Sequence, residues 1–505
     1  MMQFIFGCKV LYTTLRDLIV KNYVTCIILV TSWSIAFSTY LFSGRLYIDD
    51  INRSIKNYDN WRTGGRPLSD ILSRLFFLSS SPFNISPISH IIFFAFIAVS
   101  GIIIVRIFGK RESPKNAIYI FPIGISPFII QIASYTFDSP WYAIGVLTAT
   151  IAALISTLGL DFIVGIILQV LFIACSLCLY QPTISVFLIL SILLIFNRFL
   201  QGGEKKKLIL QTAASTIGAL AVYAVILSTL PLARYAERHK AVFHLKDLFN
   251  GFLTNTGKFI SILYTDWHNT PIFYIFLTIL LLFIVYNFIY VTKHCQKKLA
   301  PFLAVIFIIP ICFVAIGGVQ LMLANPVWQY RVMVAGSILS TVLYFSLPGI
   351  HSTIRGKIIS FVMVLLCIHS LLFASLYGFV SKMQVQYENY ILNHLVYDVD
   401  SCLARNDGIK SLDIKGSVRI SPALVHLYKI FPVLKRFNPV TFNGRSMWGY
   451  VQLKYYSSQV ADINFVASNV INLPPPTITT PYYSIYVADN EIIISFPNNE
   501  TLEQF

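Results

Sequence analysis

The chain has 505 residues, of which 56% are hydrophobic and 12% are charged, and its formal net charge at pH 7 is +16. Soluble globular domains contain about 25% charged residues, so this composition excludes an ordinary water-soluble protein. Residues 381–505 hold ten Lys/Arg and ten Asp/Glu, so residues 1–380 carry the whole net charge. The basic residues stand in loops between apolar runs and not on one water-facing module, which argues against a nucleic-acid-binding protein.

Apolar runs recur along the first three quarters of the chain, and each is long enough, at about 20 residues, to cross a hydrocarbon core about 30 Å thick. Inside lipid every backbone amide needs an internal partner, so these runs are expected to be helices. The first run ends in Ser-Gly-Arg without a small-residue cleavage pattern, so we expect it to be retained as a span. The sequence predicts eleven spans: 24–42, 87–108, 116–133, 140–157, 161–179, 183–198, 208–230, 271–292, 299–320, 332–350 and 358–380.

The short loops between these spans indicate the orientation of the chain. Positively charged short loops stay in the cytoplasm. Four short loops are basic and fall on the same side as the N-terminus: Lys110–Lys115, Arg198–Lys207, Lys293–Lys298 and Arg355–Lys357. We therefore expect a multi-pass protein of the bacterial inner membrane with a cytoplasmic N-terminus. The long loops 43–86 and 231–270 and the tail 381–505 are then periplasmic.

Loop 43–86 is too long for a simple turn, and part of it predicts an amphipathic helix at the membrane surface. Its apolar residues recur at helical spacing: Leu68, Ile71, Leu72, Leu75 and Phe76. The tail contains short β-prone runs separated by Asn, Gly and Pro: Ser417–Ile420, Trp448–Leu453, Tyr482–Ala488 and Glu491–Phe496. We therefore predict an α-helical polytopic membrane module over 1–380 and a small mixed α/β periplasmic domain over 381–505.

The segment just beyond the first predicted span carries the residues best suited to chemistry. Two adjacent carboxylates, Asp49 and Asp50, stand in Tyr-Ile-Asp-Asp-Ile-Asn-Arg, which ends at Arg53. Burying either carboxylate is costly unless it is paired. A partly buried carboxylate at this position is suited to take a proton from a sugar hydroxyl as a general base. The alternative is a charged cap at the end of a helix.

Further along the same loop lie Tyr58, Trp61 and the run Gly-Gly-Arg-Pro-Leu, whose arginine is Arg66. The guanidinium groups of Arg53 and Arg66 are suited to clamp a phosphate with paired donors. The rings of Tyr58 and Trp61 either stack on the face of a sugar or belong to an aromatic belt at the membrane interface.

The pattern YIDDINR, the aromatic residues Tyr58 and Trp61, and GGRPL together resemble the serotype-converting O-antigen glucosyltransferases, of type II, carried by temperate phages of enteric bacteria. The resemblance implies a GT-C-like membrane fold with an acidic first outer loop. It also implies transfer of glucose from a polyprenyl-phosphate donor to a lipid-linked O-antigen repeat in the periplasm, which modifies lipopolysaccharide serotype. The likeness is strongest over residues 40–80 and continues more weakly through Ser134–Asp138, Tyr180–Pro182 and Gln329–Arg331.

The predicted topology independently favours a donor delivered by the membrane. The cytoplasmic loops are short and contain no Gly-rich phosphate loop, so they offer no site for a nucleotide sugar. The expected partners are polyprenyl-phosphate-linked glucose, lipid-linked O-antigen and membrane lipid, and no nucleic acid.

We hypothesise that Asp49 or Asp50 is the general base of a single inverting displacement. The arginines that would stabilise the departing phosphate are Arg53, Arg66 and Arg331. Two carboxylates are too few ligands for a dedicated metal site, so we expect no metal or other cofactor, and the sequence does not support a divalent cation.

Three later residues each allow two interpretations. Asp138 is either a helix N-cap or a second active-site carboxylate. Arg331 either snorkels at the membrane surface or contacts the donor phosphate. Gln181 is either a polar residue at a kink or a ligand of the sugar. Trp267, at the end of the second long loop, is expected to be an interfacial tryptophan.

Two other functions remain open. An O-antigen polymerase also joins lipid-linked glycans outside the membrane and fits the large outer loops, but not the aspartate pair. A polysaccharide transporter or flippase usually has ionisable residues at mid-membrane and paired halves. Here acids such as Asp161 fall near span ends, and no duplication is visible.

Overall fold

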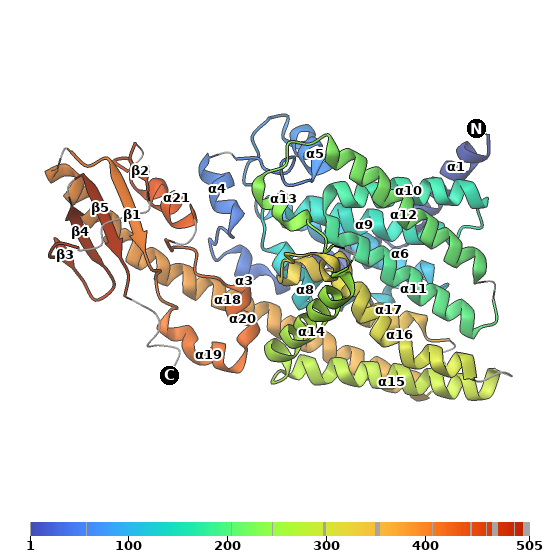
Figure 1. The fold of residues 1–505 in the computed structure, drawn as a ribbon. Coiled ribbons are helices and arrows are strands. Elements are labelled where there is room, and N and C mark those ends of the chain that lie inside the picture. Colours follow the sequence, from blue (N-terminus) through green and yellow to red (C-terminus); the bar gives the residue numbers. More distant parts are fainter. Residues whose placement is uncertain are drawn as a thin grey trace. The chain divides into compact units, whose positions relative to one another are not determined.

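The structure of the chain is a computed structural model with two compact units (Figure 1). The helical unit comprises Met1–Ser38 and Asp59–Ser375, and the sheet unit comprises Thr39–Tyr58 and Leu376–Phe505. The described residues are 2–56, 58–203, 205–244, 246–295, 299–348, 354–406, 408–444, 447–460, 462–466, 473–488 and 490–497.

The helical unit consists almost entirely of apolar helices, drawn from blue to yellow in Figure 1. The last one, α18 (Ile354–Arg405), also continues into the sheet unit. The others are α1 (Met2–Lys21), α2 (Tyr23–Ala36), α5 (Pro67–Phe77), α6 (Ile88–Ile107), α7 (Ala117–Ile125), α8 (Pro127–Ala133), α9 (Ser139–Ile155), α10 (Phe162–Leu179), α11 (Ile184–Leu200), α12 (Lys206–Ser228), α13 (Arg234–Lys240), α14 (Leu248–Trp267), α15 (Pro271–His294), α16 (Leu299–Gly317) and α17 (Gly336–Ser346).

Seven of the described helices are long and apolar enough to cross a membrane, or nine if each of two bent helix pairs counts as one span. The chain is therefore a multi-pass membrane protein, as predicted. The predicted spans 140–157 and 332–350 correspond to shorter apolar helices, Ser139–Ile155 and Tyr330–Ser346. The number of eleven spans stays a prediction.

Two helix pairs are bent, and the local sequence accounts for the second bend. The helices α1 and α2 meet at 66° on either side of Asn22, and the segment ending with α7 meets α8 at 65°. Ser126 between α7 and α8 has an extended backbone and precedes Pro127. A residue before proline disfavours the helical conformation, so the break at Ser126 is expected.

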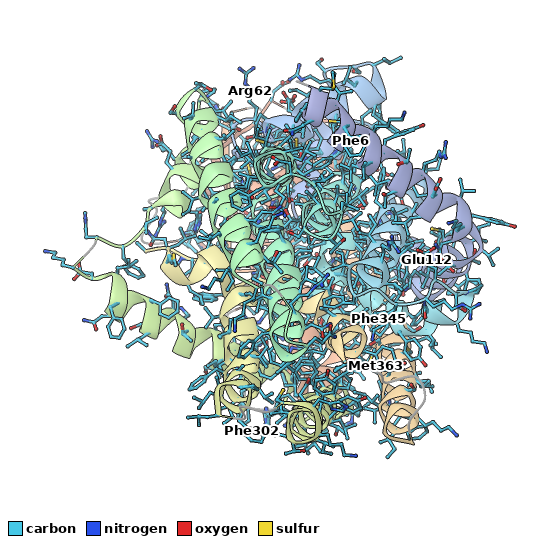
Figure 2. The ribbon with its side chains drawn as sticks, turned by 90° about the vertical axis from the view of Figure 1, so that its right-hand side faces the viewer. Phe6, Arg62, Glu112, Phe302, Phe345 and Met363 are labelled. Atoms are coloured by element: carbon cyan, nitrogen blue, oxygen red, sulfur yellow. The ribbon has the colours of Figure 1, made fainter. Side chains whose placement is uncertain are left out.

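In the packed interior, Phe345 and Met363 lie fully buried between the helices (Figure 2).

The amphipathic helix predicted in the first long loop is α5. Its polar side chains Ser69, Asp70 and Ser73 are buried, and Ser69 Oγ donates to the backbone oxygen of Leu179 at 3.0 Å. Several of its apolar side chains point outward, and Leu75 is 65% exposed. A helix that buries its polar face and exposes its apolar face suits contact with lipid.

The sheet unit packs helices against a five-stranded mixed sheet of order β2-β1-β5-β4-β3. The pairs β1–β2 and β1–β5 are parallel, whereas β3–β4 and β4–β5 are antiparallel. Its elements are α3 (Ser38–Leu41), α4 (Asp49–Lys56), β1 (Ser411–Lys415), α19 (Val425–Ile430), α20 (Pro432–Phe437), α21 (Met447–Tyr456), β2 (Asn464–Phe465), β3 (Ile478–Thr479), β4 (Ser484–Ala488) and β5 (Glu491–Ser495).

Two of the four predicted strands are confirmed, as β4 and β5. The run Trp448–Leu453 was wrongly expected to be a strand, because it lies in helix α21, which packs against α4. Ser417–Ile420 forms only an isolated bridge, between Ser417 and Asn443. Strand β1 was not predicted from the sequence, although its residues pair along their whole length with β5.

Candidate active site

The helical unit contains a buried carboxylate, Asp138, at the beginning of α9. Its Oδ1 accepts hydrogen bonds from Trp61 Nε1 at 2.5 Å and from Arg66 Nη1 at 3.2 Å. The same nitrogen of Arg66 also donates to the hydroxyl of Tyr142, one helical turn after Asp138. Asp138 stands at the N-cap position of α9, but its side chain makes no capping hydrogen bond. Its carboxylate instead binds the indole of Trp61 and the guanidinium of Arg66. Asp138 and Arg66 form an ion pair whose side chains are mostly buried.

A glutamine and a tyrosine hold the loop that carries Arg66 by hydrogen bonds to its backbone. Gln181 Nε2 donates to the backbone oxygens of Gly64 and Gly65 at 3.3 and 3.1 Å. Tyr223 on α12 donates to the same Gly65 oxygen at 2.8 Å. Gly65 has a φ of +75°, and a Cβ there would lie 3.1 Å from Gln181 Nε2. The glycine is required both by its backbone conformation and by this close approach.

Three short segments far apart in the sequence meet beside this loop. The rings of Tyr142 and Tyr180 stack with centroids 3.9 Å apart. The hydroxyl of Tyr180 donates to the backbone oxygen of Arg331 at 2.9 Å. The guanidinium of Arg331 lies 4.9 Å from the centre of the Tyr135 ring. The segments around Asp138, Gln181 and Arg331 that resemble the glucosyltransferases are thus brought together by the fold.

A second buried acid, Asp266, lies beside Tyr330, the residue before Arg331. Tyr330 donates from its hydroxyl to Asp266 Oδ2 at 2.9 Å and accepts from Trp267 Nε1 at 2.7 Å. Trp267 is only 6% exposed, so the expectation of an interfacial tryptophan was wrong. Its indole is buried because Tyr330 and Phe373 pack against it.

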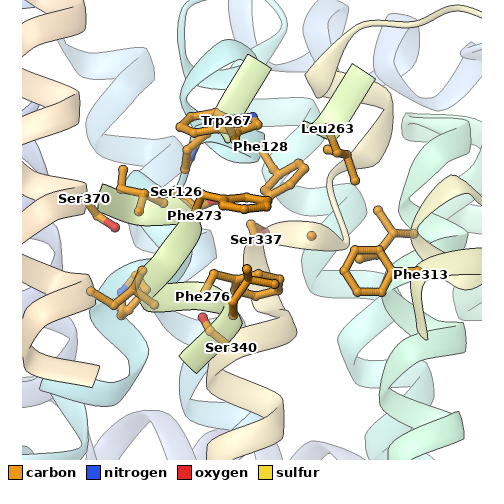
Figure 3. Close-up of a pocket in the computed structure, with 17 residues that line it drawn as sticks. Ser126, Phe128, Leu263, Trp267, Phe273, Phe276, Phe313, Ser337, Ser340 and Ser370 are labelled. Atoms are coloured by element: carbon orange, nitrogen blue, oxygen red, sulfur yellow. The ribbon is translucent and has the colours of Figure 1, made fainter. Parts of the chain in front are cut away.

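Two apolar cavities adjoin these polar side chains in the helical unit. The first, of about 120 Å³, lies beneath Trp267 and Phe128, and the hydroxyls of Ser126, Ser337, Ser340 and Ser370 are its main polar groups (Figure 3). Phe128 also packs against Tyr330, with ring centroids 5.5 Å apart.

The second cavity, of about 310 Å³, is lined by Phe137 and Trp141, on either side of Asp138 in the sequence. Both cavities are therefore walled mainly by hydrocarbon, with a few hydroxyl groups among their lining residues, as sites for amphiphilic ligands are.

The adjacent carboxylates Asp49 and Asp50 open helix α4 in the sheet unit. Asp50 and Arg53 are fully buried one turn apart, with Asp50 Oδ1 and Arg53 Nη1 separated by 4.0 Å. Asp49 is half-buried. Ile48, just before them, has a φ of +50°, which is strained for a β-branched residue. Backbone strain of this kind gathers at functional sites.

The segment before α4 is held by the C-terminal part of the chain, within the sheet unit. Tyr47 donates from its hydroxyl to the backbone oxygen of Phe437 at 2.8 Å. Arg45 Nη2 donates to the backbone oxygen of Pro439 at 2.5 Å. The strained turn and the two carboxylates after it are thus fixed by residues almost 400 positions later in the sequence.

The predicted site residues therefore fall into two groups. The first is one bonded group in the helical unit, with Trp61, Arg66 and Asp138 at its centre and Gln181 and Arg331 at its edges. The second lies in the sheet unit and consists of Asp49, Asp50, Arg53 and Tyr58, whose ring is 48% exposed. Sequence reasoning missed Tyr142, Arg45 and Asp266, since each looks like an ordinary span-end residue until its partner is known.

Among the described residues there is no group of three or more His, Cys, Asp or Glu side chains that could hold a metal ion.

Comparison with known proteins identifies the family. No solved structure matches the chain. An uncharacterized 55.3 kDa protein from the gtrB 5′ region of Salmonella phage P22 is 21% identical over 426 residues, which cover 81% of this chain and 85% of that protein. The sequence model of the family "Glucosyl transferase GtrII" matches residues 39–346, more than half of the chain. The match includes Asp49, Arg66, Asp138 and Arg331, and the chain therefore belongs to the GtrII glucosyl transferase family.

Proposed function

We propose that this protein transfers glucose from a polyprenyl-phosphate donor to a lipid-linked O-antigen repeat unit at the periplasmic face of the bacterial inner membrane. The observation that carries this proposal is the family match over residues 39–346, since that range contains both the aspartate pair and the residues around Asp138. The basic short loops support a cytoplasmic N-terminus, and hence a periplasmic first loop and tail.

Asp49 is the better candidate for the general base. A base must reach the proton that it removes. Asp49 is half-buried, whereas Asp50 is fully buried and lies beside Arg53. We therefore assign Asp50 and Arg53 the role of holding the first turn of α4, and Asp49 the removal of the proton.

The reaction is a single displacement. Asp49 takes the proton of the acceptor hydroxyl, and the hydroxyl oxygen forms a bond to the anomeric carbon of glucose. The bond between that carbon and the phosphate oxygen breaks, and its electron pair leaves with the phosphate. One displacement inverts the configuration at the anomeric carbon.

Arg66 and Arg331 are the residues we propose to stabilise the departing phosphate. Both guanidinium groups are held in place, Arg66 by Asp138 and Arg331 over the ring of Tyr135. Charges fixed in advance stabilise a developing negative charge without reorganisation during the reaction. The two apolar cavities are suited to the polyprenyl chain of the donor, and the exposed ring of Tyr58 is suited to stack on a sugar.

The test is a transfer assay in membranes that contain the full-length chain, radiolabelled polyprenyl-phosphate glucose and lipid-linked O-antigen. Asp49→Asn is expected to lower the transfer rate at least about a hundredfold, in the range lost with a general base. Asp17→Asn is the matched control, because Asp17 is an exposed acid on α1. If the Asp49→Asn/Asp50→Asn double variant transferred glucose at the wild-type rate, the assignment of Asp49 as the general base would be wrong. Translocation of glycan without glucose transfer by the wild type would favour a flippase.

A further inference from the structure

The turn between α3 and α4 holds a buried arginine with open donors. Arg45 is only 6% exposed, and its Nη2 donates to the backbone oxygen of Pro439. Its Nε and Nη1 have no hydrogen-bond partner within the described part of the chain. Buried donors of a charged group without acceptors cost free energy, so such an arrangement persists where another group supplies the acceptors.

The guanidinium of Arg45 is fixed by its own turn. The backbone N–H of Arg45 donates to Ser43 Oγ at 3.2 Å, and Gly44 has a φ of +73°. The hydroxyl of Tyr47, two residues later, donates to the backbone oxygen of Phe437. The turn is thus tied at two points to the end of α20 and the residues just after it, and the guanidinium needs little further ordering to bind a ligand.

The charges around Arg45 within the sheet unit favour an anion. The last turn of α20 carries Lys435 and Arg436. The nearby buried acid, Glu388, does not pair with Arg45, because its oxygens accept from Gln384 Nε2 and from the N–H and hydroxyl of Thr441. Burial raises the pKa of the Tyr428 hydroxyl to about 12, while the charge of Arg45 acts in the opposite direction. Arg45 is therefore a buried positive charge, and the carboxylate of Glu388 is engaged by other donors.

The open donors suit a phosphoryl group. In a guanidinium, Nε–H and Nη1–H point to opposite sides, so a single anionic group can accept from only one of them. A phosphoryl group offers several acceptor oxygens and is a preferred partner of arginine. Arg45 follows α2 closely in the chain, and Phe42 between them is 78% exposed, as expected at a membrane interface. A phosphate carried on a lipid is presented at that level.

We propose that Arg45 binds a phosphoryl group of a lipid-linked saccharide through one of its open donors, Nε–H or Nη1–H. This inference rests on the proposed function and adds a phosphate contact to it. Arg53, Arg66 and Arg331 each have a side-chain partner in the fold, whereas the two open donors of Arg45 have none among the described residues.

The test measures binding separately from transfer. Purified full-length chain is titrated with farnesyl phosphate, farnesyl diphosphate, inorganic phosphate and farnesol, and thermal unfolding is followed by tryptophan fluorescence. Both farnesyl phosphates are expected to raise the unfolding temperature of the wild type, and farnesol is not. In Arg45→Gln the apparent Kd is expected to rise at least about tenfold, the loss typical of charged hydrogen bonds. Arg405→Gln, an exposed arginine of the same unit, is the matched control.

Each outcome decides the proposal. If Arg45→Gln binds farnesyl phosphate as tightly as the wild type does, the site is refuted. This holds even where the variant without ligand unfolds at a lower temperature. If Arg45→Gln fails to fold, Arg45→Lys keeps the charge without an Nε–H, and an unchanged KM for the lipid phosphate in that variant refutes the site. If farnesyl phosphate and farnesyl diphosphate bind equally well, the site binds a single phosphate. If the diphosphate binds more tightly, the site binds its second phosphate. Arg45-dependent binding without glucose transfer by the wild type overturns the proposed function and leaves the site standing.

Discussion

The indole of Trp61 and the carboxylate of Asp138 form a 2.5 Å hydrogen bond across 77 positions of sequence. The Asp138 oxygen that accepts it also accepts from Arg66. This shared oxygen ties the first long loop to the beginning of α9, so the orientation of Arg66 depends on both residues. Substitutions at the two ends of this hydrogen bond should therefore have different consequences.

Asp138→Asn is expected to lower the transfer rate per folded molecule at least about tenfold, because it leaves the charge of Arg66 without its carboxylate. Breaking a buried pair also costs about 3–5 kcal/mol of the free energy of unfolding, so the yield of folded protein should fall. Trp61→Phe removes the N–H donor and also part of the buried indole, so it should cost about 1–3 kcal/mol for the lost bond in addition to the cost of the space left behind. The measurements are transfer rate and thermal unfolding in detergent.

Asp161→Asn serves as the control for the Asp138 variant. Asp161 caps α10 by accepting from the backbone N–H groups of Ile163 and Val164, and asparagine is an equally good N-cap, so Asp161→Asn should change the stability little. Its transfer rate should stay at the wild-type value. An Asp138→Asn protein as active per folded molecule as Asp161→Asn would show that the Asp138 carboxylate is dispensable.

Gly65→Ala should destabilise the loop that carries Arg66. The left-handed backbone of Gly65 and the approach of its would-be Cβ to Tyr223 and Leu227, at 3.2 and 3.1 Å, both oppose a side chain. Such strain costs about 1–3 kcal/mol. Gly202→Ala is the control, since Gly202 has a φ of +71° with open space around it and reports backbone strain alone. The unfolding temperature and the transfer rate should both fall further in Gly65→Ala than in Gly202→Ala. Equal effects in the two variants would exclude a steric role for Gln181 and Tyr223.

Much of the fold follows from local sequence, and much of the site does not. Apolar length predicted membrane spans, helical spacing predicted α5, and short β-prone runs predicted β4 and β5. Trp448–Leu453 is also β-prone, yet it is helical because α21 packs against α4. That contact joins residues about 400 positions apart, so no local pattern encodes it.

The candidate site shows the same limit. Asp49, Arg66 and Asp138 could be singled out because charged residues at span ends are costly and therefore informative. Arg45 could not, because its burial depends on a bond to Pro439, 394 positions away. In the same way, only the fold shows that the amide of Gln181 holds the Gly65 backbone.

The orientation of the chain can be tested by labelling with a membrane-impermeant maleimide in intact cells. In a Cys8→Ser background, which removes the exposed cysteine, Ser80→Cys should be labelled without permeabilisation and Lys115→Cys only after it. The reason is that Lys115 belongs to a basic short loop, and such loops stay in the cytoplasm. The reverse pattern would place the Asp49 segment in the cytosol and overturn the periplasmic reaction.

The buried hydroxyl of Tyr428 predicts how the sheet unit responds to alkaline pH. Burial raises the folded-state pKa to about 12, against about 10 for an unfolded tyrosine. The unfolded chain therefore releases this proton first, and the stability that Tyr428 contributes is complete below pH about 10 and is lost as the pH rises towards about 12. The difference between the two pKa values corresponds to about 3 kcal/mol of stability. Tyr428→Phe should be less stable than the wild type at pH 8, because Asn438 loses its acceptor, but its unfolding temperature should fall less steeply between pH 10 and 12. Parallel pH curves for the two proteins would show that this hydroxyl titrates normally in the fold.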